Sequence, residues 1–101
     1  MTQDFDNNSK KDIFVFKLFV AGDEQHSNRA RSNLKAICET HLKDRYQVEV
    51  IDVFTCFELA IENDIFLSPA LVKESPGLRT VIFGNLNSTA DVLQALELDG
   101  T

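Results

Sequence analysis

The side chains best suited to thiol or metal chemistry in this sequence are two cysteines and two histidines, and their spacing favours neither. They are Cys38, Cys56, His26 and His41. Thiol–disulfide exchange usually needs Cys-x-x-Cys, which is absent. A metal site needs three or four converging ligands, and Cys38 and His41 fall together on one apolar helical stripe. We therefore expect no metal, no cofactor, an inert buried Cys38, and a Cys56 that is a surface or half-buried bystander.

Charge and composition exclude other classes of function. The chain of 101 residues has 16 acidic against 10 basic residues and a formal net charge of −6, so a nucleic-acid partner is not expected. No apolar run approaches the roughly 18–20 residues of a membrane span, since Lys17 interrupts the longest one. Without a signal-peptide pattern at the start, the expected location is cytoplasmic. Residues 1–12 are expected to form a mobile polar tail and residues 13–101 a single domain.

The first half of the chain predicts a strand, a helix and a strand. Residues 13–20 form a nearly continuous β-branched and aromatic run, typical of a strand buried on both faces. Ser27 is a candidate N-cap for a helix that ends near residues 43–44. Its apolar stripe would be Ala30, Leu34, Ile37, Cys38 and His41. Residues 46–53 predict a second strand, which should run parallel to the first because short links on either side of a helix make a βαβ unit.

The next segment predicts a short helix and then a hairpin. Thr55 and Glu58 have the spacing of a capping box, and the helix that follows would bury Phe57, Ala60 and Ile61. Residues 70–73 and 80–83 are strand candidates. Between them, Ser75-Pro76-Gly77-Leu78 predicts a type II turn, so these two strands should pair antiparallel.

The last helix completes a recognisable order of elements. Ser88 and Asp91 again fit a capping box, with Val92, Leu93 and Leu96 as the apolar side. The order β-α-β-α-β-β-α predicts an α/β domain of thioredoxin-like fold. Such folds keep a cis-proline before the third strand, and Ser68-Pro69 stands there, although a trans bond is also allowed. Where a thioredoxin has its reactive thiol, this chain has Asp23-Glu24-Gln25-His26-Ser27 and no sulfur.

Several stretches together resemble the KaiB family of circadian-clock proteins. They are Lys17-Leu18-Phe19-Val20-Ala21-Gly22, Ser27 with Arg29-Ala30, Val50-Ile51-Asp52-Val53, residues 65–73 and Gly84-Asn85-Leu86-Asn87. The resemblance covers residues 13–98. It implies a domain that is not an enzyme and that binds the hexameric ATPase KaiC, with KaiA sequestered by the complex in cyanobacteria.

The resemblance also implies candidate partner-binding residues. Carried over by position, these are the basic residues Arg29, Lys43 and Lys73. The expected function is docking on a KaiC-type ATPase in a circadian or stress-linked timing switch. Alternatives are an adaptor acting on a histidine kinase, since such kinases carry a related domain, or a thiol redox protein. A homodimer or tetramer is also compatible with the sequence.

Members of the family can adopt two different folds, and the resemblance implies the second fold as an alternative for this chain. The family's tetrameric resting form differs from the thioredoxin-like, partner-binding form in the C-terminal half. The positions expected to bear on this choice are Pro69, Pro76, Gly84, Asn85, Ala95 and Glu97. Ala95 stands where the family has glycine, and alanine favours helix by about 0.8–1 kcal/mol. We therefore expect a bias toward the thioredoxin-like form even without a partner.

Overall fold

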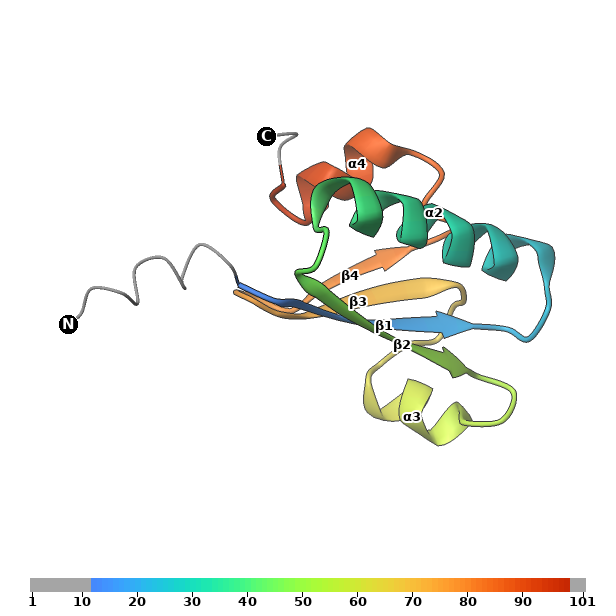
Figure 1. The fold of residues 1–101 in the computed structure, drawn as a ribbon. Coiled ribbons are helices and arrows are strands. Elements are labelled where there is room, and N and C mark those ends of the chain that lie inside the picture. The colour runs from blue at the N-terminus through green and yellow to red at the C-terminus, as the bar shows by residue number, and fades with distance from the viewer. Residues whose placement is uncertain (1–11, 99–101) are drawn as a thin grey trace, which may run out of the picture.

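The computed structural model describes residues 12–98, and its elements follow the predicted order, β-α-β-α-β-β-α (Figure 1). They are β1 (Phe14–Val20), α2 (Gln25–His41), β2 (Tyr46–Asp52), α3 (Phe57–Glu62), β3 (Ala70–Ser75), β4 (Thr80–Phe83) and α4 (Thr89–Ala95). The predicted polar tail lies outside the described residues, apart from Asp12. The observed C-terminal half is the thioredoxin-like one.

The four strands form one mixed sheet in the order β2-β1-β3-β4. As predicted, β1 pairs parallel with β2, and β3 pairs antiparallel with β4. The strand β1 also pairs antiparallel with β3, so it lies inside the sheet. Its residues Phe16, Leu18, Phe19 and Val20 are almost completely buried, because both faces of this strand are covered.

The two faces of the sheet have separate cores. In Figure 1, α2 and α4 cover one face, and α3 lies against the other. The larger core joins alternate residues of β1 to the inner sides of α2 and α4, including Leu34, Ile37, Val92 and Leu96. The smaller core consists of Phe19, Ile51, Ala60, Ile65, Ala70 and Val72. One short helix therefore covers only part of a face that two helices cover on the other side.

The predicted ends of α2 are wrong. The helix begins at Gln25, and the carboxylate of Glu24 accepts a hydrogen bond from the Ser27 N–H at 3.1 Å. Ser27 is instead buried inside the helix, where its hydroxyl accepts from the Ala21 N–H at 2.9 Å. At the other end, Leu42 is the C-cap and is fully buried, whereas His41 is half-buried rather than a core residue.

The predicted cap and apolar stripe of α3 are also wrong. The helix begins at Phe57 after Cys56, and no side chain caps it. Of the three residues expected in the core, only Ala60 is buried, while Phe57 and Ile61 are exposed. A helix of six residues presents little more than one inward position to the sheet, and Ala60 takes it.

The hairpin and the last helix largely match the prediction. The pairing of β3 with β4 ends at Lys73 and Thr80, so the predicted four-residue turn over 75–78 is part of a longer loop. Gly77 has the expected positive φ of 77°. The Ser68–Pro69 and Ser75–Pro76 bonds are both cis. The Ser88 hydroxyl accepts from the Asp91 N–H at 3.4 Å, which confirms the cap of α4.

Candidate functional site

A groove lies at the place of a thioredoxin's reactive thiol in this protein. A hollow of about 550 Å³ is lined by Ala21, Glu24, His26, Ser68, Pro69, Gly84 and Asn85. The carboxylate of Glu24 accepts hydrogen bonds from the backbone N–H groups of His26 and Ser27, and these bonds hold the pKa of Glu24 below its usual value. The first turn of α2, which would stabilise a thiolate in a redox protein, is therefore already capped by a carboxylate.

Neither cysteine lies in this groove. Cys38 is buried in the larger core, and burial raises the pKa of its thiol to about 12, with a further contribution from the charge of Glu39. Cys56 is exposed at the start of α3. The predicted burial of Cys38 and exposure of Cys56 are confirmed. Among residues 12–98, no group of three His, Cys, Asp or Glu side chains is placed to hold a metal ion.

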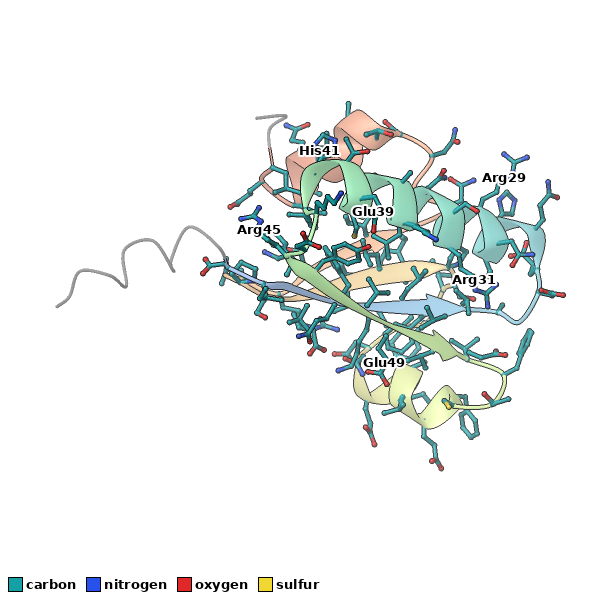
Figure 2. All side chains as sticks on the ribbon, viewed as in Figure 1. Arg29, Arg31, Glu39, His41, Arg45 and Glu49 are labelled. Carbon is teal, nitrogen blue, oxygen red and sulfur yellow. The ribbon has the colours of Figure 1, made fainter. Side chains whose placement is uncertain are left out.

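The three predicted partner-binding residues lie in different surroundings. Arg29 is exposed on α2 (Figure 2), and Lys43 is exposed just beyond its end. Lys73 is only 6% exposed, and its ammonium group donates to the Pro76 carbonyl oxygen at 2.7 Å. Lys73 is mostly covered because β3 is an inner strand and the loop after it folds back over the side chain, and its role in partner binding stays a prediction.

Three of the expected conformational positions, Pro69, Gly84 and Asn85, line this groove. The N–H of Gly84 donates to the carbonyl of the buried Pro69 at 2.9 Å. Gly84 has a φ of 106°, a backbone conformation that favours glycine. The next residue, Asn85, accepts from the Asn33 side chain at 2.8 Å through its carbonyl. These contacts join the start of β3 and the segment after β4 to each other and to α2.

The other three conformational positions lie apart from this groove. Pro76 is in the hairpin loop, where it accepts from Lys73. Ala95 is the last residue of α4 and is exposed. Glu97 follows with a positive φ of 61°, between the inward-facing Leu96 and Leu98. Their role in a change of fold stays a prediction.

A group of apolar side chains is exposed around α3, and the sequence interpretation missed it. Phe57 and Ile61 from the helix, with Phe66 and Leu67 from the segment after it, line a hollow of about 190 Å³. We call these four residues the α3 face. Phe66 and Leu67 are 73% and 67% exposed. Isolated exposed apolar residues are ordinary, whereas a contiguous group marks an interaction site.

A signal for this surface was present in the sequence. Residues 53–67 contain more large apolar side chains than one two-turn helix can bury. The smaller core takes Ala60 and Ile65 from this segment, with Val53 packed at its margin. Phe54 is left 72% exposed beside Gly22. An excess of apolar residues over available core positions is the pattern that could have indicated a docking surface.

A third hollow lies between α2 and the edge strand β2. It has a volume of about 290 Å³ and is lined by Leu18, Leu34, Val48, Val50, Tyr46, Arg31 and Lys35. Figure 2 shows Arg31 and Glu39 on the side of α2 toward this strand. The hydroxyl of Tyr46 donates to Glu39, and this hydrogen bond raises the pKa of Tyr46 to about 12.

Comparison with known proteins gives a consistent result. Residues 17–98 match the family model described as the KaiB domain. The chain is 41% identical over 91 residues to the circadian clock oscillator protein KaiB of a Picosynechococcus species, covering 90% of this chain and 88% of that one. It is 34% identical over 84 residues to the circadian clock protein KaiB3 of a Synechocystis species, covering 83% and 82% of the two chains.

Solved structures of similar shape are thioredoxin-like. The N-terminal domain of SasA from Synechococcus elongatus superposes with a TM-score of 0.69 at 23% identity, covering 89% of each chain. Mitochondrial thioredoxin 3 from Saccharomyces cerevisiae superposes with a TM-score of 0.68 at 19% identity, covering 93% of this chain and 87% of that one. The predicted thioredoxin-like fold is confirmed. Among the residues described, no helix has the length and apolar character needed to cross a membrane.

Proposed function

Because the chain belongs to the KaiB family, we propose that it is a non-enzymatic, cytoplasmic interaction domain that docks on a KaiC-type hexameric ATPase. Docking would regulate a circadian or stress-linked timing switch. The groove at the thioredoxin thiol position contains no cysteine, which disfavours the redox alternative.

The observation that carries this proposal is the α3 face. Phe57, Ile61, Phe66 and Leu67 are all more than half exposed around one hollow. Full burial of a Phe or Leu side chain contributes about 1.5–3 kcal/mol. Covering several of them at once can therefore offset the cost of association, about 4–15 kcal/mol. A protein partner is the ligand best suited to an open apolar surface of this kind.

A second candidate function follows from the similarity to the SasA domain. The same surface could engage a histidine kinase, so that the chain would act as an adaptor in trans. A KaiA-like protein is a further possible partner once a complex with the ATPase has formed. A homodimer or tetramer remains part of the proposal, because the outer edge of β2 has no neighbouring strand in the sheet.

Sedimentation with a KaiC-type ATPase from the same organism, in ATP or ADP, tests the proposed function. We expect a stoichiometric complex for the wild-type chain. Phe57→Ser should weaken it, whereas Leu78→Ser, which changes an equally apolar exposed side chain in the hairpin loop, should not. If no complex forms after overnight incubation with any such ATPase, the assigned partner is wrong, and the same variants should be tested with a histidine kinase.

A further inference from the structure

The segment that carries the α3 face has charges of one sign. From residue 46 to residue 72 the sequence contains no Lys, Arg or His. Its charged residues are Glu49, Asp52, Glu58, Glu62 and Asp64. The carboxylate of Asp52 accepts hydrogen bonds from the N–H groups of Gly22 and Phe54, at 3.2 and 2.9 Å. The other four carboxylates are exposed.

The acidic residues of α3 lie directly beside its apolar stripe. Phe57 and Ile61 are four residues apart and share one side of the helix, and Glu58 and Glu62 share the adjacent side for the same reason. Asp64 follows at the end of the helix. From β2, Glu49 lies on the side of the sheet toward α3 (Figure 2). Neither Glu58, Glu62 nor Asp64 has an ion pair among the described residues.

One cation reaches this region from elsewhere in the chain. The guanidinium of Arg79, in the hairpin loop, donates to the Asn63 carbonyl oxygen at 2.6 Å. It offsets part of the charge at the C-terminal end of α3 and leaves the Glu58 end without a cation. Lys17 lies on the same side of the sheet but pairs with Glu74 at 2.8 Å. The residues that line the hollow carry no charge, and the charged side chains of α3 beside it, which we call its rim, are acidic.

These observations disfavour a second copy of this chain as the occupant. In a symmetric dimer through this face, the acidic α3 segment of one copy would lie against the acidic α3 segment of the other, and like charges brought together oppose association. An apolar hollow with an acidic rim is instead complementary to an apolar anchor with basic neighbours. A hollow of about 190 Å³ has room for one such anchor, since a cavity of about 150 Å³ holds a benzene ring.

We propose that the α3 face receives a partner segment that inserts one aliphatic or aromatic side chain into the hollow and sets Lys or Arg side chains against Glu58, Glu62 and Asp64. This inference rests on the proposed docking function and specifies the chemistry of the partner. It differs from the expectation attached to Arg29 and Lys43, which would meet an acidic surface. The two surfaces thus require opposite charges on what they bind.

The test uses two synthetic amphipathic helical peptides with the same apolar positions, one with Lys and one with Glu at every polar position. Each is titrated into the isotope-labelled full chain and followed by amide chemical shifts. We expect the Lys peptide to shift residues 54–67 and to bind at least about tenfold more tightly than the Glu peptide. Raising the salt from about 0.05 M to about 0.5 M should weaken its binding.

Two variants and one matched control locate the contact. Phe57→Ser should abolish the shifts, and Glu58→Lys should lower the affinity for the Lys peptide by about tenfold. Asp12→Lys changes the net charge by the same amount at an exposed position just before β1 and should leave the affinity unchanged. Equal binding of both peptides, equal effects of the two charge reversals, or shifts confined to other residues would overturn the inference.

The outcome separates the partner chemistry from the proposed function, because the titration contains no ATPase. If the ATPase sediments with the chain but the peptide results fail, docking stands and the basic-partner inference is wrong. If the peptide results hold but no ATPase binds, the α3 face is a docking surface for a different basic partner. A dimer that Phe57→Ser converts to monomer, with no peptide shift in either form, would replace the inference by self-association.

Discussion

The two faces of the sheet use apolar side chains in opposite ways. On one face, the 17 residues of α2 place Ala30, Leu34, Ile37 and Cys38 in the core, and the charged residues point to solvent. On the other face, the six residues of α3 bury Ala60 and leave Phe57 and Ile61 exposed. A long amphipathic helix stabilises the fold, whereas a short helix that is apolar on more sides than it can bury leaves a surface for recognition.

The two faces also differ in charge. Residues 25–45 contain the basic residues Arg29, Arg31, Lys35, Lys43 and Arg45, against the acidic Glu39 and Asp44. The segment that carries α3 has only acidic residues. The net charge of −6 therefore conceals two surfaces of opposite sign. Each of the following predictions tests the difference between the α2 side and the α3 side.

The largest difference should appear in thiol reactivity. Cys38 lies on the α2 side, and the rise of its pKa from 9.0 to about 12 lowers its thiolate fraction roughly a thousandfold. Cys56, exposed beside α3, should react with DTNB at neutral pH in the native protein, with Cys38 reacting only after unfolding. Two fast-reacting thiols in the native state would contradict the assignment of Cys38 to the core. The Cys56→Ser variant identifies which thiol reacts first.

The next largest effect concerns stability. Leu34→Ala removes a buried side chain from α2 and should lower the free energy of unfolding by about 2–5 kcal/mol. Phe57→Ala removes a larger but mostly exposed side chain and should cost about 1 kcal/mol or less. Urea unfolding followed by circular dichroism measures both values. Equal losses would mean that α3 contributes to the core as much as α2 does.

For binding to the ATPase, we expect the larger effect on the α3 side, whereas for stability it is expected on the α2 side. Phe57→Ser should weaken docking on the ATPase by about 2 kcal/mol or more, close to thirtyfold, because anchors in apolar hollows dominate interfaces. Titration calorimetry against the ATPase gives the dissociation constants, with Leu78→Ser as the control. The assignment of the α3 face would fail if both variants bound like the wild-type chain.

Arg29→Ala should have a smaller effect on binding. Its exposed guanidinium is expected to meet an acidic partner surface, where a charge at a rim contributes about 0.2–1 kcal/mol. The loss should appear mainly in the association rate and should shrink as salt is added. Lys35→Ala, which removes another exposed cation of α2, shows whether the effect is specific to position 29 or common to the basic side.

The smallest effect is expected at the end of α4. Ala95→Gly introduces the residue that the resemblance to the KaiB family leads us to expect at this position. It should destabilise the helix by at most about 1 kcal/mol. Backbone chemical shifts of the free wild-type protein should be helical at residues 92–95, and the glycine variant should show a larger share of any alternative form. Strand shifts there in the free wild-type chain would disprove the expected bias toward the thioredoxin-like fold.

The sequence predicted the fold well and the site less well. The element order, the parallel pairing of β1 with β2, the hairpin and the cap at Ser88 were all correct. These features depend on local hydrophobic periods, about 2 residues in a strand and about 3.6 residues in a helix, and on the short links between elements. Ser27 and Thr55 were wrongly chosen as caps, because a capping residue must meet free N–H groups whose position depends on where the chain enters the helix.

What the sequence by itself determined is which segments become strands and helices, and that the charge of the segment around α3 is entirely acidic. Only the tertiary structure decided that Lys73 is buried and that Phe57 and Ile61 are exposed. Periodicity shows which side of a helix is apolar, but burial depends on what packs above that side. Here the sheet face beneath α3 is filled by Ala60 and Ile65, so the remaining apolar side chains face outward.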